Sequence, residues 1–437
     1  MTNAYAATRQ QGRTDRPAKD EPIFTRIKAQ IVGAIFLQRI GANVSIGGNL
    51  FPFPVSLFLT PLLTLWNILT GAAQLSMPRF ALYTGFVAIM MFSTILNSGG
   101  HSTPSMFLVA GIYAMFLFPI QLEDKAYIRF FRLLANVATF VCLLGVVQYA
   151  IQYVWSPEWL FSWRTVVPKS FLIEYNTLNE TRYGSHIFKA NGFFLMEASF
   201  QSQLASRVLL ICIFILKDFR YTIPLGIGML TTYSGTGIIL FAIFGLVPLL
   251  FIFAQRSRFG ALLPIGLLLM PLAIALLWNT LNLGLFVERL GEISNPRSSA
   301  YARFVTSQIM LDIFSNSNLL KLLVGAGPGA SEVYSQGVYT TGETFASTWI
   351  KLILEYGLLG FSLFLVFFFT CVRETLRSNW LALAFTFHFF FLDGGFAAPQ
   401  QAFMTMLLGA YVCLKASNAN GAPSAPPLFQ APLGRRT

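Results

Sequence analysis

Long apolar runs, separated by short polar segments, recur along the whole chain. Apart from two short ones, the runs have 15 to 25 residues, close to the roughly 18–22 that a helix needs to cross a hydrocarbon layer of about 30 Å. Because lipid offers no hydrogen-bond partners to the backbone, such runs are expected to be helices. The pattern predicts an all-α, polytopic transmembrane helix bundle with about 12 spans. The runs are 27–46, 51–70, 80–96, 105–120, 130–154, 200–216, two short ones within 221–254, 261–277, 346–370, 379–393 and 400–414.

One apolar segment, 221–254, is interrupted by Ser234, Gly235, Thr236 and Gly237. Gly, Ser and Thr permit a break at membrane depth where neighbouring helices satisfy the released backbone groups. The segment is therefore expected to form two short helices with a bend between them.

The two ends of the chain differ in character from its middle. Residues 1–25 are polar and basic, and residues 416–437 are rich in Ala, Pro and Ser, so both segments are expected to be disordered. The polar start does not resemble a cleavable signal peptide. The transmembrane domain is then 26–415, and it contains two longer polar loops, 155–198 and 281–345.

Composition and charge agree with a membrane protein. Hydrophobic residues make up 55% of the chain and charged residues 11%, against roughly 25% charged in soluble domains. The net charge of +12 does not indicate nucleic acid, because Lys and Arg lie in short loops beside the apolar runs. Such basic loops mark the cytoplasmic side. They predict an inner-membrane protein with both termini in the cytoplasm and both long loops in the periplasm.

Familiar motifs of soluble enzymes and metal sites are missing from the sequence. There is no P-loop, H-E-x-x-H, G-x-S-x-G or dinucleotide-binding fingerprint. No C-x-x-C pair occurs, so neither a disulfide framework nor a zinc site is expected. The four cysteines lie within or at the ends of apolar runs: Cys142, Cys212, Cys371 and Cys413.

Charged residues gather where the first loop meets the following span. Arg182, Lys189 and Glu197 precede the span that begins at residue 200, and Arg207 lies inside it. Anchoring of the helix end at the membrane surface explains the first three equally well. A charge inside a span is costly and usually faces a cavity or another charge.

The second loop carries arginines before a helical pattern. Arg297 and Arg303 precede an amphipathic stretch, 304–314, which Gly325-Ala-Gly327 follows. Arginine presents a fork of donors that suits phosphate oxygens. The Gly-rich turn fits a phosphate site or a simple tight turn.

Lys351 and Glu355 lie four residues apart in the next span, so they share a helix face. They are either a mutually neutralising pair or functional groups. The remaining single polar residues are interpreted as structural: His101, His186, His388 and Asp393.

The order of these features resembles the Wzy-type superfamily of bacterial O-antigen polymerases and ligases, over roughly residues 130–415. Lys189-Ala-Asn-Gly-Phe-Phe-Leu-Met-Glu197-Ala-Ser is similar to the family pattern, with Lys for the usual Arg and Ala198 for the usual Pro. Arg303, the Gly325 turn and Glu355-Tyr-Gly-Leu-Leu-Gly resemble the later motifs. Ligases carry a histidine shortly before the last motif, and loop 281–345 has none. The chain therefore looks more like a polymerase of the exopolysaccharide (xanthan gum) type.

The resemblance implies a metal-independent glycosyltransferase without a cofactor. It would transfer a growing undecaprenyl-diphosphate-linked glycan onto a lipid-linked repeat unit at the periplasmic face. Glu197, or else Glu355, would act as base or orient the acceptor hydroxyl. Implied partners are the undecaprenyl-diphosphate-linked oligosaccharide, membrane lipid, and co-polymerase or export proteins. Cations would hold the diphosphates: Arg303 with Arg182 or Lys189, then Arg297 and Arg207.

Other classes of protein remain open. The chain is alternatively an O-antigen-type ligase, or a structural membrane partner of an export complex. A third alternative is a transporter or flippase of lipid-linked oligosaccharide, which would show two similar halves and polar residues spread over many helices. The polar candidate residues are instead concentrated in two loops, which favours an enzyme.

Overall fold

The computed structural model describes most of the chain between residues 21 and 415. The expected span 261–277 and the terminal segments 1–20 and 416–437 lie outside the described residues. Only the backbone is described for residues 45, 46, 49–51, 302 and 303. The described residues are 21–46, 49–97, 102–155, 158–174, 177–181, 186–249, 301–336 and 346–415.

The chain is mostly helical, as predicted. In the described part, 4 helices are long and apolar enough to cross a membrane: α3 (Met77–Leu96), α5 (Asp124–Ile151), α6 (Ala198–Ile211) continued by η5 (Cys212–Leu216), and α17 (Thr348–Leu376). The total of about 12 spans stays a prediction. The shorter helices are α1 (Glu21–Ile31) continued by η2 (Val32–Phe36), α2 (Val55–Leu69), α4 (Thr103–Ala114) with η3 (Met115–Leu117), α7 (Thr222–Leu230), α8 (Gly235–Phe241) with η7 (Ala242–Leu246), α18 (Asn379–Phe387) with η10 (His388–Leu392), and α19 (Pro399–Gly409).

The bend predicted within 221–254 is present. α7 ends at Leu230 and α8 begins at Gly235. Between them the hydroxyls of Thr231 and Thr232 donate to the carbonyls of Gly228 and Met229, at 3.0 and 2.6 Å. Side-chain hydrogen bonds therefore satisfy part of the backbone that the break releases.

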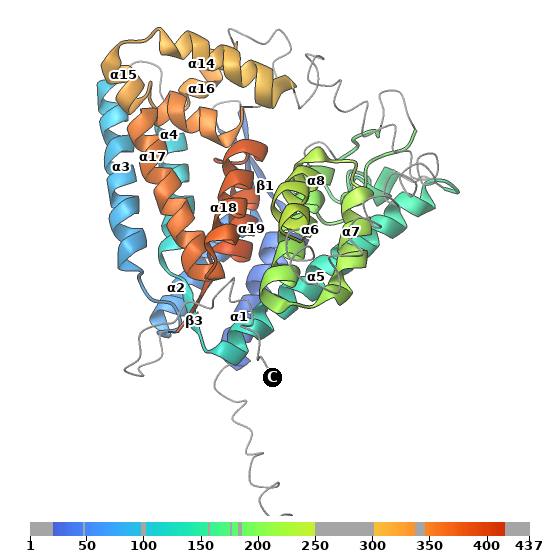
Figure 1. Cartoon of the computed structure of the whole chain (residues 1–437). Helices are drawn as coiled ribbons and strands as arrows, with labels where there is room; N and C mark the ends of the chain where they lie inside the picture. Colours follow the sequence, from blue (N-terminus) through green and yellow to red (C-terminus); the bar gives the residue numbers. More distant parts are fainter. Residues whose placement is uncertain are drawn as a thin grey trace, which may run out of the picture.

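The bundle has two distinct ends (Figure 1). At the lower end, called the terminal end here, an oxygen of Glu21 lies 3.5 Å from Arg129, and the amide of Lys415 donates to the carbonyl of Leu122. A short parallel sheet joins β3 (Ile120–Leu122) to β4 (Val412–Leu414) at the same end. The first and last described residues therefore lie at one end of the bundle.

The opposite end, called the loop end, carries both long polar segments. Three short helices cross the top of α17 there: α14 (Ser307–Ser315), α15 (Leu319–Val324) and α16 (Ala330–Gln336). The segment between α5 and α6 lies at the same end (Figure 1). The amphipathic stretch predicted at 304–314 is helical: its π-helical turn η9 (Ala302–Thr306) leads directly into α14.

The start of the chain differs from the expected first span at 27–46. α1 begins at Glu21, inside the segment 1–25 that was expected to be disordered, and η2 ends at Phe36. A hairpin of β1 (Gly41–Ile46) and β2 (Asn49–Pro54) follows. Pro52 and Pro54 lack the amide hydrogen that a helix needs. A Cβ on Gly41 would lie 2.3 Å from the carbonyl oxygen of Phe53, so the hairpin also requires glycine there.

Aromatic side chains form the core beneath α14–α16. Phe364 of α17 lies 4.9 Å from Phe86 of α3 and 4.8 Å from Tyr113 of α4, measured between ring centroids. Phe368 stacks on Phe389 at 4.3 Å. All five rings are fully buried. Edge-to-face and stacked contacts of this kind add to the stability gained from burial, so α17 is firmly seated under the loop end.

A buried arginine fastens the terminal end. Arg79, near the start of α3, donates from Nε to Glu374 at 2.7 Å. Its Nη1 atom donates to the carbonyls of Phe116 and Ala410, at 2.7 and 2.9 Å, and Nη2 donates to the carbonyl of Cys371 at 3.1 Å. One guanidinium on α3 therefore binds α17, η3 and the residue that follows α19. The carboxylate of Glu374 compensates its charge.

Candidate functional site

Two glutamines of α5 hold the last part of the first long loop. Gln148 donates to the Asn191 side chain at 2.8 Å and accepts from the Asn191 amide at 2.9 Å. One helical turn later, Gln152 donates to the carbonyl of Phe188 at 3.0 Å and accepts from its amide at 2.7 Å. The segment 188–191 is therefore fixed along the end of α5.

A buried arginine holds the rest of this loop. Arg39 donates to the carbonyl of Leu195 through Nε and Nη2, at 2.9 and 2.6 Å, and to that of Phe161 through Nη1 at 2.8 Å. A carboxylate oxygen of Glu174 lies 3.5 Å from Nη1, and the Trp163 ring centroid lies 5.2 Å from Cζ. Because one guanidinium binds three separate stretches, the loop is a packed part of the bundle.

Lys189 and Glu197 lie on this fixed segment. Lys189 is 9% exposed, and its backbone amide donates to the carbonyl of Asn179. Glu197 is half-buried and directly precedes α6, and the hydroxyl of Ser199 donates to its carboxylate. A carboxylate at the start of a helix is stabilised by the helix dipole. Glu197 therefore combines a fixed position with access to solvent.

The turn between these two residues has an uncommon backbone. Gly192 and Phe193 both adopt left-handed conformations, with φ of 65° and 67°. A Cβ on Gly192 would lie 2.5 Å from a methyl group of Val141, so the close approach to α5 needs glycine. A non-glycine residue such as Phe193 in this region persists only where its surroundings hold it.

Glu355 lies on α17, below α16. Its side chain is 5% exposed, and its carboxylate accepts a hydrogen bond from Ser331 at 2.5 Å. Its backbone carbonyl accepts from the Ser93 hydroxyl at 2.9 Å and from the Gly327 amide at 3.1 Å. Ser331 therefore donates to this carboxylate, and Gly329, Tyr356 and the charge of Lys351 also act on it.

The Gly-rich turn and the Glu355 motif interlock. Gly325 has φ 86° and ψ 179°, and Gly357 has φ 66° and ψ −173°, a region that essentially only glycine adopts. A Cβ on Gly325 would lie 2.3 Å from the carbonyl of Glu355, and a Cβ on Gly357 would lie 2.3 Å from the carbonyl of Leu323. Each glycine thus makes room for the backbone beside the other. The turn that was interpreted as a phosphate site or a simple turn packs closely against the backbone of α17.

Arg207 lies at the centre of a buried polar cluster. Its Nη1 atom donates to Thr405 at 2.7 Å, and Nη2 lies 2.7 Å from Nδ1 of His388 and 3.8 Å from a carboxylate oxygen of Asp393. Arg207, His388 and Asp393 are all fully buried. The histidine and the aspartate, interpreted separately from the sequence, belong to one cluster. Their packing compensates the cost of burying a charge inside the bundle.

A short series of contacts leads from this cluster toward α14. The amide and hydroxyl of Thr348 both donate to the carbonyl of Asp393 at 3.0 Å. The hydroxyl of the preceding Ser347 lies 3.3 Å from that of Ser307, the first residue of α14. Arg303 lies one turn earlier, in η9. The backbone that carries Arg303 therefore lies close to the start of α17, which also contacts the Arg207 cluster.

The predicted site residues fall into three groups. Lys189 and Glu197 lie on the loop between α5 and α6. Glu355 lies beneath α16, and Arg207 lies within the bundle, connected through α17 to the helix after Arg303. Two further candidates lie outside the described residues: Arg182 and Arg297.

The residues that position the first loop were not predicted from the sequence. Gln148 and Gln152 are two amides four residues apart in an apolar run, a readable sign of one polar face. Arg39 lies in the expected first span, 27–46, but nothing near it in the sequence identified Glu174 as a partner. Ser331 gave no signal, because a lone serine in a loop is common.

Within the described residues, no group of three or more His, Cys, Asp or Glu side chains is arranged to hold a metal ion. No protein-family model matches the sequence, and no curated protein and no solved structure is significantly similar to it. Function is therefore inferred from the residues and their arrangement.

Proposed function

We propose that this chain is an integral membrane polysaccharide polymerase, which transfers a growing undecaprenyl-diphosphate-linked glycan onto a lipid-linked repeat unit. One observation carries the proposal: two polar segments far apart in the sequence, 186–197 and α14–α16, both lie at the loop end of an apolar bundle, on opposite sides of it in Figure 1. An amphiphilic substrate needs this combination, because polar groups must meet its sugars and diphosphate while its polyprenyl chain stays in lipid.

The proposed reaction is a single glycosyl transfer. A hydroxyl oxygen of the acceptor repeat attacks the anomeric carbon of the growing glycan. The bond from that carbon to the diphosphate oxygen breaks, and its electron pair leaves with undecaprenyl diphosphate. The hydroxyl proton passes to a carboxylate. Because negative charge grows on the phosphate oxygens, fixed cations nearby lower the barrier.

Exposure distinguishes the two candidate carboxylates. Glu197 is half-buried, so an acceptor hydroxyl has access to it, and it is the proposed base. Glu355 is 5% exposed and bonded to Ser331, so it is assigned the role of holding α16 against α17.

The cation candidates keep their order except for one. The proposed diphosphate ligands are Arg303 with Arg182 or Lys189, and then Arg297, because guanidinium and ammonium groups donate directly to phosphate oxygens. Arg207 is fully buried, with Nη atoms beside Thr405 and His388. It is therefore proposed to position the start of α17 rather than to touch substrate.

The proposed orientation follows from charge. Basic residues gather at the terminal end, on α1, the first turns of α5 and the last turn of α17. Basic segments flanking spans remain in the cytoplasm. The loop end would then face the periplasm of an inner membrane, where lipid-linked repeats are joined.

Replacement of one arginine tests the proposal in cells. Arg303→Ala is expected to abolish polymer while single repeat units accumulate on lipid, because the leaving diphosphate loses a fixed cation. Lys321→Ala, which removes a cation from neighbouring α15, is the matched control and should leave polymer unchanged. Gel analysis of polymer and mass spectrometry of lipid-linked repeats measure both.

The outcomes separate the alternatives. Polymer of normal length and yield in a folded Arg303→Ala protein would remove Arg303 from the site. If lipid-linked repeats fail to reach the outer leaflet in the Arg303→Ala strain, the result would favour a transporter. Normal polymer that fails to attach to a final acceptor would favour a ligase.

A further inference from the structure

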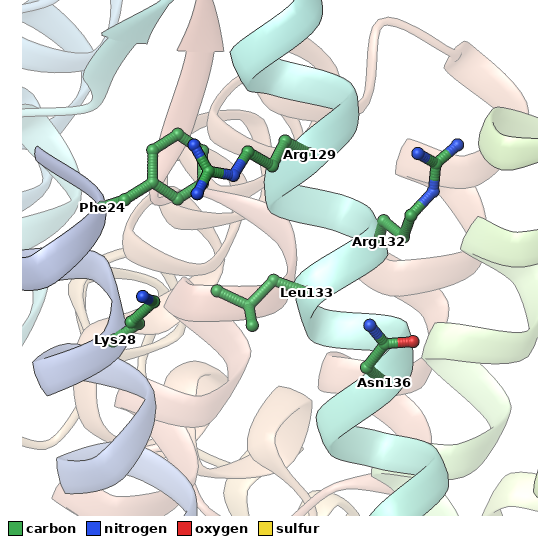
Figure 2. Close-up of a pocket in the computed structure, with 6 residues that line it drawn as sticks. All are labelled: Phe24, Lys28, Arg129, Arg132, Leu133 and Asn136. Carbon is green, nitrogen blue, oxygen red and sulfur yellow. The ribbon is translucent and has the colours of Figure 1, made fainter. Parts of the chain in front are cut away.

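A pocket opens at the terminal end between α1 and α5. Its volume is about 180 Å³. Figure 2 shows Arg129 reaching from α5 onto the Phe24 ring of α1, with Lys28 further along α1 and Leu133 pointing toward α1, while Arg132 and Asn136 lie on the side of α5 away from α1. Cations around an apolar floor, between helices at a membrane boundary, are suited to an anionic lipid headgroup. The lining residues are Phe24, Lys28, Arg129, Arg132, Leu133 and Asn136.

Nearby carboxylates leave this pocket positively charged. An oxygen of Glu21 lies 3.5 Å from Arg129, but both side chains are more than half exposed, at 56% and 53%, so water weakens the pair. Asp218 is bound by Arg220, with 2.7 Å between Oδ2 and Nη2. The hydrogen bonds from Arg220, with the charge of Arg132 adding to them, lower the pKa of Asp218 to about 2. Asp218 is therefore paired with Arg220.

The lining side chains still offer donors after these pairs are counted. The Arg129 guanidinium lies over the Phe24 ring, 4.2 Å from its centroid. A guanidinium stacked in this way keeps its N–H edge for an anion. The carbonyl oxygen of Asn136 accepts from the Tyr221 hydroxyl at 2.8 Å, so its NH₂ group is the part that offers donors. Together with Lys28, these groups suit phosphate oxygens.

An exposed apolar stripe continues from the pocket along α5. Leu133, Asn136, Phe140, Leu143 and Val147 are spaced three or four residues apart and so share one helix face. The last three are 50%, 48% and 50% exposed. From Asn136 to Val147 the stripe is about 16 Å long, at about 1.5 Å per residue. That is about half of a roughly 30 Å hydrocarbon layer, the depth that one acyl chain occupies.

We propose that this pocket binds the phosphate group of an anionic phospholipid, with one acyl chain lying along Phe140, Leu143 and Val147. A free phosphate would use the cations and leave the stripe bare, whereas a phospholipid uses both. The site lies at the opposite end of the bundle from the proposed glycan transfer, so it does not rest on that function. Bound lipid joins α1 to α5, whose other end holds the first loop through Gln148 and Gln152.

Native mass spectrometry of the whole protein, released from nanodiscs, tests the proposal. The probes are phosphatidylglycerol, phosphatidylcholine and glycerol phosphate. Lys28→Gln with Arg129→Gln removes one lining cation from each of the two helices. The matched control, Lys125→Gln with Arg373→Gln, removes two exposed cations from the same end outside the pocket. Lys28→Gln alone serves if the double variant folds poorly, because the Lys28 side chain is exposed.

Wild-type protein and the control are expected to retain phosphatidylglycerol in preference to phosphatidylcholine. The double variant should retain about tenfold to thirtyfold less, since each cation near anionic lipid contributes about 1 kcal/mol. Phe140→Ala with Leu143→Ala should also reduce retention. Equal retention in the double variant and the control would overturn the proposal. So would glycerol phosphate binding as tightly as the lipid, which would identify a soluble phosphate as the occupant.

Discussion

A single methyl group added to Gly357 should disrupt the close packing between the Gly-rich turn and α17. In Gly357→Ala the new Cβ would lie 2.3 Å from the backbone carbonyl of Leu323. The residue would also have to keep φ 66° and ψ −173°, which alanine rarely adopts. Glu355 lies two residues earlier, so a shift of this backbone separates its carboxylate from Ser331.

Two costs determine the size of the effect. Holding a non-glycine residue in this conformation costs on the order of 1–3 kcal/mol. Relieving the overlap by moving packed backbone costs about 1–3 kcal/mol more. The expected loss is therefore about 2–6 kcal/mol, against a total stability of roughly 5–15 kcal/mol for a typical protein. Such a loss should disrupt α15 and α16 before the aromatic core beneath them.

The free energy of unfolding in mixed detergent micelles measures this loss, and polymer length in cells measures its consequence. The matched control is Gly111→Ala in α4, where an added Cβ meets no atom within 4 Å. Alanine there should stabilise the helix by no more than about 1 kcal/mol. If Gly357→Ala proves as stable as Gly111→Ala and makes normal polymer, the close packing of Gly357 against Leu323 is not needed for the fold.

Two further substitutions test other parts of the account. Glu197→Gln should slow chain extension in isolated membranes by about 10²- to 10⁴-fold, the usual contribution of a general base, and an unchanged initial rate would exclude it as the base. Arg79→Ala should lower the free energy of unfolding by about 3–5 kcal/mol, because the buried carbonyls of Phe116, Ala410 and Cys371 each lose the hydrogen bond that Arg79 donates. Arg373→Ala, at an exposed position, is its control, and equal losses in the two variants would contradict the role given to Arg79.

The apolar pattern was enough to predict the helices but not where the first one ends. Length and hydropathy identified the long helices, and the bend near Ser234 was readable from its Gly and Thr residues. The expected first span, 27–46, runs into β1, and the second, 51–70, begins within β2, because both strands contain apolar residues. Pro52 and Pro54 argued against a helix at the start of the second span, and hairpin pairing is a contact that periodicity does not reveal.

The arrangement of the candidate site was less predictable for a physical reason. Glu355 and Gly325 were singled out separately, and their close packing depends on backbone conformations that no side-chain pattern encodes. Arg207, His388 and Asp393 were each visible as polar residues in apolar runs. Their meeting depends on how α6, η10 and the segment before α19 pack, which is a tertiary property.

The most direct test of the central claim uses purified protein and the lipid-linked repeat units extracted from its own host. With no nucleotide sugar present, the protein should convert single repeats into lipid-linked chains and release undecaprenyl diphosphate in equal amount to the bonds formed. Glu197→Gln should yield neither product. Repeats that remain single, or that only change leaflet when the folded protein is in vesicles, would contradict the proposed glycan transfer.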